Sequence, residues 1–423
     1  MRILVLGSGA REHALAWKLS HEPGVTHVVC APGNPGIART TSVAPVDALD
    51  TDAVIRLVDS ARIDLTVVGP EAPLGNGLAD RFEAEGRRVF GPTRGAAQLE
   101  TSKAFAKDFM RRHNVPTARY RVCTSAEEAL EAIRSGEFGD ALVVKADGLA
   151  AGKGVVVAPD RETAAAAVEA AMVEKTFGDA GARVVLEELL TGPEVSFFVV
   201  ANGVDYVPLL SAQDHKRVFD EDRGPNTGGM GAFSPSPLID EALQQQIETT
   251  IVQPVLNGMA AEGNPFRGFL YCGLMLTADG PKVIEFNVRF GDPEAQVVLP
   301  LLGSLSELLT NPKPQAPSPR PAEVAVGVVL AAHGYPGELR TGDPIRGISD
   351  VARDCRDAMI FFAGVRKKGP DLVTSGGRVM TVMATGPSYD IAIARAYEAA
   401  SKIKFDGMQY RRDIGRKALV VGS

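Results

Sequence analysis

The first hundred residues alternate between short apolar runs and longer amphipathic stretches. The apolar runs predict strands at 2–7, 25–31, 63–70 and 87–92. Between them, apolar residues recur with the helical period, which predicts helices at 11–22, 49–62 and 77–86. Because strands that alternate with helices favour a parallel sheet, we expect residues 1–100 to form an N-terminal parallel α/β domain.

From Thr101 the pattern is that of an α+β unit. Amphipathic or alanine-rich stretches predict helices at 101–114, 125–135 and 163–175. Strands are predicted at 119–123, 140–148 and 183–190, and a hairpin closed by Asn202-Gly203 is predicted at 194–210. Residues 101–310 are therefore expected to form a second domain.

The chain then passes through a proline-rich segment into a third unit. Residues 311–322 hold too many prolines for a helix or a central strand and predict a semi-rigid linker. Apolar runs at 323–337 and 378–386 predict strands, and 388–403 predicts a helix. Residues 323–423 are expected to form a small C-terminal α+β domain.

Residues 211–237 show little periodicity and many glycines, prolines, charged and amide side chains. A structureless run of this length inside a domain is usually functional or disordered. The charged series 214–217 is unusual for a solvated loop, although a mobile surface loop is the alternative. His215 is a weak candidate for a catalytic base, because a lone histidine more often makes a structural hydrogen bond.

Residues 284–290 alternate with a period of two after an Asp-Gly turn, which predicts the second strand of a hairpin. One face of this strand is apolar, and the other carries Glu285, Asn287 and Arg289, spaced about 6.5–7 Å apart. This polar face is either an ordinary solvated surface or a functional site.

The residue types on that face favour a site. Carboxylate and amide oxygens, as in Glu285 and Asn287, are the hard ligands that Mg²⁺ prefers. Arg289, one step further, can hold an anion in a fork. The rigid turn that follows aims these side chains at one place, while the roles of Asp292 and Glu294 within the turn stay open.

The composition narrows the class of protein. The chain has 423 residues with 45% hydrophobic and 23% charged, an ordinary globular balance, and its net charge of −7 disfavours a general binder of nucleic acid or anionic membranes. Because no apolar run approaches 18 residues and the first one leads into a glycine turn, we expect neither a membrane helix nor a signal peptide. Four widely spaced cysteines indicate reduced thiols and a cytoplasmic protein.

A glycine-rich turn, Gly7-Ser8-Gly9, follows the first predicted strand and opens a helix. Free N–H groups and the helix dipole make such a turn suitable for phosphate, although a tight turn without a ligand is the alternative. A dinucleotide site would need a third glycine where Glu12 stands and an acid in residues 31–36, and both are missing. The loops at 31–36 and 69–74 lie at the same expected sheet edge.

Two further segments suit a nucleotide. Lys145 ends a predicted strand and precedes the glycine-rich stretch 147–154, which is not a Walker loop because Gly154 follows Lys153. Such a stretch can fold over a polyphosphate or simply form a hairpin turn. Residues 187–190, followed by Glu194, offer backbone groups to an adenine edge and a carboxylate to a ribose, or they are an ordinary acidic turn.

Together these motifs resemble the ATP-grasp carboxylate–amine ligases, and within them the family of phosphoribosylamine–glycine ligases of purine biosynthesis. The resemblance covers nearly the whole chain and rests on five motifs in this order: GSGAREHALAW, GPEAPL, VVKADGLAAGKGV, SAQDHKRV…GPNTGGMGA and IEFNVRFGDPEAQ. The sequence departs from the family's usual forms at Ala10, Val288, Phe362 and in RRDIGRKA, which contains Arg412. The C-terminal substrate contacts therefore stay open.

The resemblance implies a pre-ATP-grasp N-terminal domain, an ATP-grasp fold with a mobile lid at about 118–190, and a C-terminal domain that closes the cleft. It implies ATP contacts at Lys107, Lys145, Gly148, Gly152, Gly154, Glu187, Glu188, Leu189, Leu190 and Glu194. It implies substrate contacts at Gly9, Arg11, Glu12, Asn34, Glu71, Asp214, Lys216, Gly229 and Arg289. Of these, Asp214, Lys216 and Arg289 are the expected catalytic residues, and Glu285 and Asn287 are the expected ligands of Mg²⁺ or Mn²⁺.

The resemblance also implies a reaction. A carbon–nitrogen ligase of this family uses ATP to convert glycine into glycyl phosphate, and the amine of 5-phosphoribosylamine then displaces phosphate to give glycinamide ribonucleotide. The expected partners are these small molecules, with no nucleic acid and no membrane, and the expected assembly is a monomer or a weak homo-oligomer. Alternatives are another ATP-grasp ligase, a nucleotide-binding protein without catalysis, and, least supported, a dehydrogenase.

Overall fold

The computed structural model describes residues 1–150, 154–310 and 322–420. The predicted proline-rich linker lies outside the described residues apart from its last residue. Among the helices that are described, none combines the length and the apolar character that crossing a membrane requires.

The N-terminal region is a five-stranded sheet in the order β3-β2-β1-β4-β5, and every pairing in it is parallel. Its strands are β1 (Arg2–Gly7), β2 (His27–Pro32), β3 (Ser42–Val43), β4 (Leu65–Val68) and β5 (Val89–Phe90). Its helices are α1 (Ala10–Ser20), α2 (Thr51–Ser60), α3 (Glu71–Gly75) and α4 (Leu78–Ala84). The expected parallel α/β architecture is confirmed. The two-residue strand β3 and the short helix α3, which falls largely in the loop predicted at 69–74, had not been predicted.

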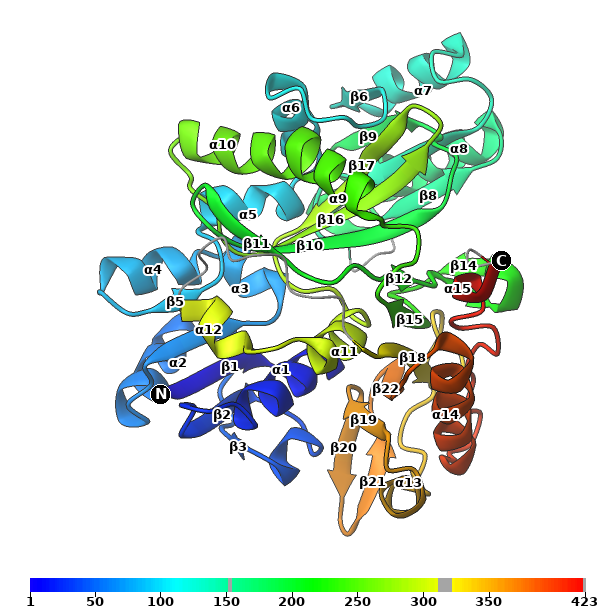
Figure 1. Ribbon diagram of the computed structural model, residues 1–423. Coiled ribbons are helices and arrows are strands. Elements are labelled where there is room, and N and C mark those ends of the chain that lie inside the picture. The colour runs from blue at the N-terminus through cyan, green and yellow to red at the C-terminus, as the bar shows by residue number, and fades with distance from the viewer. Residues whose placement is uncertain (151–153, 311–321, 421–423) are drawn as a thin grey trace.

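The central region contains two antiparallel four-stranded sheets (Figure 1). The first has the order β6-β9-β7-β8, formed by β6 (Tyr120–Cys123), β9 (Val184–Glu188), β7 (Leu142–Ala146) and β8 (Val155–Ala158). The second has the order β11-β10-β16-β17, formed by β11 (Asp205–Pro208), β10 (Glu194–Asn202), β16 (Arg267–Thr277) and β17 (Gly280–Asn287). The hairpin closed by Asn202-Gly203 is confirmed.

Helices flank and connect these sheets. They are α5 (Arg94–Thr101), α6 (Lys103–Arg112), α7 (Ala126–Ser135), α8 (Arg161–Val168), α9 (Glu241–Ile247), α10 (Gln253–Ala261), α11 (Ala295–Val298) and α12 (Leu305–Thr310). The predicted helix at 163–175 begins two residues earlier and ends in a π-helical turn at Glu169–Val173.

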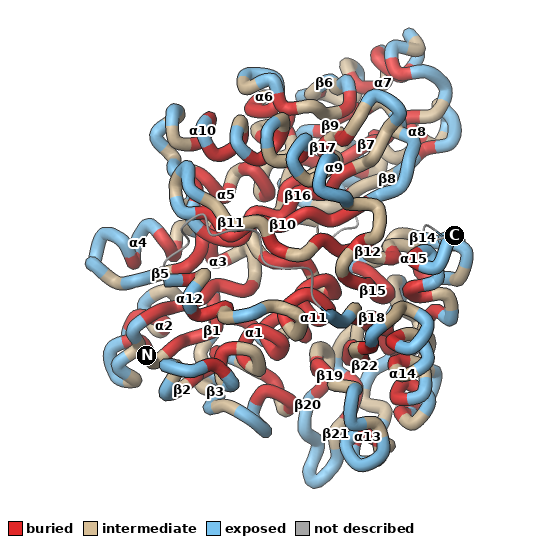
Figure 2. Tube along the Cα trace, viewed as in Figure 1, coloured by how far each residue is buried: buried red, intermediate tan, exposed pale blue. Residues whose placement is uncertain are grey.

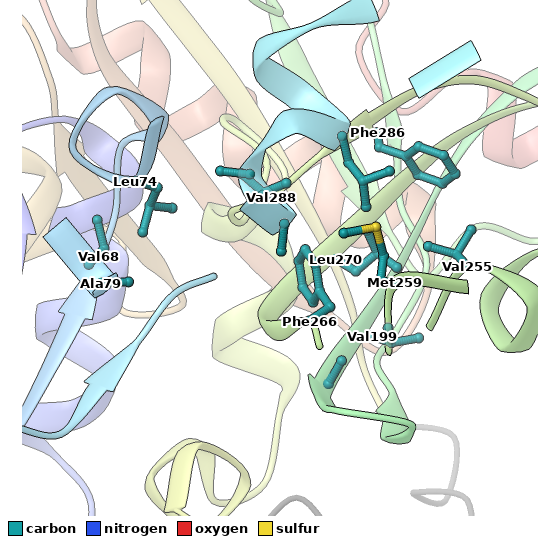
Figure 3. Packing of buried hydrophobic residues seen from close by; sticks show 14 of the residues in the cluster. Val68, Leu74, Ala79, Val199, Val255, Met259, Phe266, Leu270, Phe286 and Val288 are labelled. Atoms are coloured by element: carbon teal, nitrogen blue, oxygen red, sulfur yellow. The ribbon is translucent and has the colours of Figure 1, made fainter. Parts of the chain in front are cut away.

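One apolar cluster joins the N-terminal sheet to the second central sheet. Figure 3 shows Val68 and Leu74 on one side, Phe286 and Met259 on the other, and Val288 between them. Burial of this apolar surface is the main stabilising contribution to the junction. Figure 2 colours the described residues by burial. The strands β1 and β10 are largely buried, whereas β20 (Val365–Lys368) is largely exposed.

The C-terminal region is a five-stranded antiparallel sheet in the order β12-β15-β18-β22-β19. Its strands are β12 (Gln213–Asp214), β15 (Gly231–Ser234), β18 (Val324–Ala331), β22 (Arg378–Gly386) and β19 (Ala358–Phe362). The remaining elements are β13 (Arg217–Phe219), β14 (Arg223–Asn226), β21 (Asp371–Thr374), α13 (Ile348–Asp354), α14 (Tyr389–Lys402) and α15 (Lys417–Val420).

Two sequence-based predictions about these elements are wrong. Residues 211–237 are not structureless, because β12 and β15 pair with the distant β18 sheet and β13 pairs with β14. The strand predicted at 284–290 ends at Asn287. Val288 and Phe290 are buried by packing and not by strand pairing, so the apolar alternation continues past the strand.

Glu22 ties the end of α1 to the start of α12. Its two carboxylate oxygens each accept a 2.6 Å hydrogen bond, one from Leu305 N–H and one from Ser306 N–H, and Lys18 Nζ lies 3.6 Å from the same carboxylate. A carboxylate that caps a helix N-terminus is stabilised by the unpaired N–H groups there and by the helix dipole. The contact therefore fixes two segments nearly 300 residues apart.

We expect Glu22→Ala to lower the free energy of unfolding by about 2 kcal/mol, because two hydrogen bonds to a charged group are lost. Differential scanning calorimetry should show a lower unfolding midpoint. The control is Glu131→Ala on the exposed face of α7, which should leave the midpoint unchanged. Equal midpoints for the two variants would show that the cap does not stabilise the fold.

Candidate functional site

A cleft of about 930 Å³ lies where the three regions meet. Its lining includes Arg11 from the N-terminal region, Lys107 and Glu285 from the central region, and Arg378 and Lys417 from the C-terminal region. Of the described residues predicted to bind ATP or metal, all but Gly148 line this cleft, including Gly154, Leu189, Leu190 and Asn287. Gly152 lies outside the described residues.

The glycine-rich turn before α1 holds an internal carboxylate. Gly9 N–H donates a 2.6 Å hydrogen bond to Glu12 Oε2, and Arg11 Nε donates a 2.6 Å bond to Glu12 Oε1. Gly7 has φ +121°, and a Cβ there would lie 2.5 Å from Glu12 Cγ. Glu12 is only 2% exposed, so the glycines create space for this side chain and the N–H group of Gly9 is already occupied.

Asn34 connects the N-terminal and C-terminal regions. Its Nδ2 donates to Phe362 O at 2.7 Å and to Ser8 O at 2.8 Å, while its Oδ1 accepts from the N–H groups of Gly36 and Ile37. Beside it, Phe362 N–H donates to His13 Nδ1 at 2.8 Å. Burial, helped by nearby Arg39, lowers the pKa of His13 to about 4. Asn34, a predicted substrate contact, thus has every polar atom of its side chain engaged within the protein.

Arg289 lies just past the end of β17 and not in the row of Glu285 and Asn287. Its Nη2 is 2.9 Å from Glu100 Oε1, and its Nε is 3.5 Å from Glu71 Oε2. Glu100 is buried and also accepts a 2.7 Å hydrogen bond from Val288 N–H. Burial lowers the pKa of Arg289, but Glu100 and Glu71 raise it more, so the guanidinium stays charged.

Two buried lysines share one carboxylate. Lys107 Nζ lies 2.8 Å from Glu187 Oε2, and Lys145 Nζ lies 2.8 Å from Glu187 Oε1. Burial lowers the pKa of Lys107 to about 8, although Glu187 opposes the shift. Burial raises the pKa of Glu187, but Lys145 and Lys107 lower it by more, so its pKa lies below the usual value. The Glu187 carboxylate is therefore ionised and is the shared counter-charge of the two lysines.

The residues after Glu187 face the cleft differently. Glu188 pairs with Arg119 at 2.7 Å, whereas the side chain of Leu189 is exposed to the cleft. Glu194, at the start of β10, pairs with Lys216 at 2.9 Å. The apolar side chain of Leu189 suits the flat adenine ring better than a charged side chain would.

Acidic groups surround Lys216 in the middle of the cleft. Its Nζ lies 3.8 Å from Glu285 Oε1 in addition to the Glu194 contact. Burial lowers the pKa of Lys216, but Glu194, Asp214 and Glu285 raise it more, so the ammonium stays charged. Burial raises the pKa of Asp214 to about 7, and the nearby carboxylates of Glu294, Glu194 and Glu285 raise it too, against Lys216.

His215 is not among the residues that line the cleft. It is 1% exposed, and neither ring nitrogen has a hydrogen-bond partner among the described residues. Burial lowers its pKa to about 3, with Lys417 and Arg411 acting in the same direction. His215 is therefore a neutral buried side chain next to β15, which does not support the weak hypothesis of a catalytic base.

Glu285 and Asn287 fit a divalent cation. They lie two residues apart on β17 and both line the cleft. Burial raises the pKa of Glu285, but Lys216, Lys145 and Lys103 lower it more, so the carboxylate is ionised. Within 1–150, 154–310 and 322–420 no three His, Cys, Asp or Glu side chains gather as a metal site. Two hard oxygen ligands suit Mg²⁺, which keeps water and phosphate oxygens in its remaining positions.

The turn after Arg289 meets the 227–229 segment. Gly229 has φ +108°, and a Cβ there would lie 2.5 Å from Pro293 Cδ, so glycine allows the two segments to approach. Asp292 faces Arg378, whose Nη2 lies 3.2 Å from Asp292 Oδ2. Glu294 is buried and accepts a 3.2 Å hydrogen bond from Ser196 Oγ. Both acids line the cleft, and Glu294 is also the N-cap residue of α11.

Among the cleft residues that escaped the sequence prediction are Glu100, Lys103, Arg378 and Lys417. Glu100 and Lys103 lie on the amphipathic helices α5 and α6, where periodicity alone does not mark a polar residue as part of a site. Arg378 begins the predicted strand at 378–386 and had no signal beyond its charge. Each reaches the cleft only because elements distant in sequence come together.

The comparisons with known proteins identify relatives over the full chain. Family models of phosphoribosylglycinamide synthetase match residues 1–100 (N domain), 101–295 (ATP-grasp A domain) and 325–417 (C domain). The phosphoribosylamine–glycine ligase of Pseudomonas aeruginosa is 49% identical over 99% of this chain and 98% of its own length.

Solved structures agree with this result. The crystal structure of phosphoribosylamine–glycine ligase from Thermotoga maritima has a TM-score of 0.85 at 37% identity and covers 98% of this chain and 100% of its own. The biotin carboxylase domain of Hydrogenobacter thermophilus 2-oxoglutarate carboxylase has a TM-score of 0.73 at 16% identity, covering 97% of this chain and 91% of that one. The second likeness shows the ATP-grasp fold alone.

We expect Glu187→Gln to destabilise the protein in a pH-dependent way. At pH 6 the variant buries two charged lysines without their carboxylate, which should cost about 3 kcal/mol or more. Without Glu187 the pKa of Lys107 falls below about 8, so at pH 9 the lysine is neutral and the deficit shrinks. Thermal unfolding of variant and wild type at both pH values measures this difference.

The matched control is Glu188→Gln, which removes a carboxylate that pairs with Arg119 instead of with a buried lysine. Its deficit should be small and the same at pH 6 and pH 9. A Glu187→Gln deficit that is equally large at both pH values would contradict the assignment of this carboxylate as the counter-charge of the lysines.

Proposed function

The chain belongs to the phosphoribosylglycinamide synthetase family, and from this premise we propose that it joins glycine to 5-phosphoribosylamine in purine biosynthesis. The products are glycinamide ribonucleotide, ADP and phosphate. The proposal rests on one observation: residues from all five family motifs line the same cleft. The lining includes Lys107 and Lys145, the side chains of Glu285 and Asn287 on β17, and Arg289.

The chemistry needs an activated carboxylate. A glycine carboxylate oxygen attacks the γ-phosphorus of ATP, the bond to ADP breaks, and glycyl phosphate forms. The amine nitrogen of phosphoribosylamine then attacks the acyl carbon, the carbon–oxygen bond to phosphate breaks, and the amine gives up a proton. Phosphoryl transfer requires positioning and positive charge more than a protein nucleophile.

ATP occupies the end of the cleft between the two central sheets. Lys107 and Lys145 contact its phosphates, exchanging part of their interaction with Glu187 for the more highly charged polyphosphate. The predicted lid over the phosphates comprises about 118–190, which includes the β6-β9-β7-β8 sheet. Residues 151–153 of its glycine-rich stretch lie outside the described residues. The backbone of 187–190 lines the adenine, and Glu194 binds the ribose.

Glu285 and Asn287 would hold Mg²⁺ or Mn²⁺. When bound, the metal would supply positive charge to the phosphate oxygens of ATP. Support comes from the ionised state of Glu285 and from the related fold of the biotin carboxylase domain, whose structure is described with MgADP. The protein contributes only two ligands, as is usual for magnesium bound with nucleotide.

Asp214, Lys216 and Arg289 line the substrate side of the cleft, and we assign them to the orientation of glycine and the acyl phosphate. Arg289 stabilises developing negative charge on oxygen because its guanidinium is held in place by Glu100 and Glu71. Arg11 and Glu71 line the cleft and are the predicted contacts available to the sugar amine. The lining does not include the other predicted contacts Gly9, Glu12, Asn34 and Gly229.

A cytoplasmic setting and a monomer or weak homo-oligomer complete the proposal. The three cysteines Cys30, Cys123 and Cys272 are buried free thiols, as expected where disulfides do not form. The partners are the small-molecule substrates, and neither nucleic acid nor membrane is required.

We expect Glu285→Ala to reduce ADP release in the presence of ATP, glycine and phosphoribosylamine by at least about 100-fold, because a metal ligand beside the transferring phosphoryl group is lost. A coupled ADP assay measures the rate, and circular dichroism checks the fold. Glu131→Ala, which truncates an exposed carboxylate of α7 outside the cleft, is the control with near-normal turnover. Near-normal turnover of Glu285→Ala would refute the metal role, and ADP release that depends on an acid other than glycine would refute the function.

A further inference from the structure

We propose that Thr117 is a positioning residue for ATP: its hydroxyl group joins the ammonium of Lys107 to the backbone of β17 and so fixes the direction in which Lys107 meets the phosphates. The inference rests on the proposed function, in which Lys107 contacts these phosphates. Thr117 is not among the residues that line the cleft, and it belongs to none of the five motifs that carry the family resemblance.

Thr117 lies in the connection between α6 and β6, beside the edge of the second central sheet. β17 is the last strand in the order β11-β10-β16-β17, so one of its edges has no neighbouring strand within that sheet. The connection covers part of this edge, because Val283 N–H donates a 2.8 Å hydrogen bond to Pro116 O and Val283 O accepts a 2.7 Å hydrogen bond from Thr117 Oγ1. The threonine side chain is therefore held by the strand that is proposed to bind the metal.

The same hydroxyl group accepts a hydrogen bond from Lys107. Lys107 Nζ lies 2.7 Å from Thr117 Oγ1 and 2.8 Å from Glu187 Oε2. A carbonyl oxygen can only accept and an ammonium can only donate, whereas a hydroxyl group does both. Thr117 therefore donates its proton to Val283 O and turns a lone pair toward Lys107, so that one orientation of the hydroxyl group satisfies both partners.

Two of the three N–H groups of Lys107 are engaged in this way. No other acceptor in the described part of the chain takes the third one, and Lys107 lines the cleft although its side chain is only 3% exposed. Because the three N–H groups diverge at tetrahedral angles, fixing two of them fixes the direction of the third. A group oriented in advance binds a phosphate oxygen without a further loss of side-chain freedom.

Lys145 shows the same arrangement without an intermediate group. Its Nζ lies 2.8 Å from Glu187 Oε1 and donates a 2.9 Å hydrogen bond to Ile284 O. Ile284 is the extra residue of a β-bulge and has no partner on β16. Each of the two lysines therefore interacts with one oxygen of Glu187 and, directly or through Thr117, with one of two successive carbonyl groups of β17.

Besides directing Lys107, the bridging hydroxyl group favours its charged form. Burial lowers the pKa of Lys107 to about 8, and Lys145 lowers it too, whereas Glu187 and Glu188 raise it. The ring of Tyr120 on β6 lies 5.9 Å from the ammonium. A hydrogen bond from an ammonium is stronger than one from a neutral amine, so loss of the hydroxyl group should lower the pKa of Lys107 further.

The affinity for MgATP tests the inference, because binding needs neither glycine nor the sugar amine. Isothermal titration calorimetry of the full-length wild type and Thr117→Val at pH 6 and pH 8.5 gives the Kd. We expect the variant to raise the Kd about 5- to 10-fold at pH 8.5, where the lost hydrogen bond leaves more of Lys107 uncharged. At pH 6 the lysine is protonated with or without the hydroxyl group, so the increase should be less than about 2-fold.

The matched variants isolate the hydroxyl group. Thr117→Ser keeps it and should bind MgATP almost as the wild type does at pH 8.5. Thr117→Ala differs from the serine variant only in that hydroxyl group, should behave like Thr117→Val, and serves if the valine variant does not fold. Thr249→Val is the control outside the cleft, because Thr249 is exposed and its hydroxyl group donates to Gln245 O at 2.9 Å, and its Kd should equal that of the wild type at both pH values.

The outcomes separate the inference from the function. A Kd that rises equally at both pH values would show that Thr117 only packs the connection to the lid, and it would overturn the inference, as would wild-type affinity of Thr117→Val at pH 8.5. A wild type that binds MgATP but releases no ADP with glycine and phosphoribosylamine would overturn the proposed function, while the comparison of affinities would still decide the role of Thr117.

Discussion

The cleft depends on one electrostatic constraint: a charge removed from water needs a partner of opposite charge. Glu187 lies between Lys107 and Lys145, and Arg289 lies between Glu100 and Glu71. The positive groups needed for phosphoryl transfer are therefore held in place before a substrate arrives. An incoming anion must compete with an internal carboxylate, which favours polyphosphates over weaker anions.

The same constraint divides the cleft along its length. Lysines line the nucleotide end, carboxylates surround Lys216 in the middle, and Arg378 and Lys417 line the C-terminal end. Glycine carries an ammonium and a carboxylate, so an acidic middle with Arg289 beside it matches both groups. An acyl phosphate formed in this cleft would have to be shielded from water, which is the role that we propose for the lid.

The sequence predicted the parts of the fold that depend on local periodicity. The parallel N-terminal sheet and the Asn202-Gly203 hairpin are examples, because their apolar positions repeat at the period of the element. It did not predict that β12 and β15 join the sheet of β18, since that pairing joins residues about 100 positions apart. The sequence also predicted a strand that reaches Phe290, because the buried residues Val288 and Phe290 continue the alternation of apolar and polar positions beyond the end of β17. The cleft residues Glu100 and Arg378 were missed for a similar reason, since partners distant in sequence give them their roles.

The central claim is that ATP and a metal meet at β17 in this cleft. A crystal structure with a non-hydrolysable ATP analogue, Mg²⁺ and glycine tests it most directly. The account predicts Mg²⁺ bound at about 2.0–2.1 Å to oxygens of Glu285 and Asn287, with the phosphates against Lys107 and Lys145. A metal held away from both β17 side chains, or a nucleotide bound outside the cleft, would contradict it.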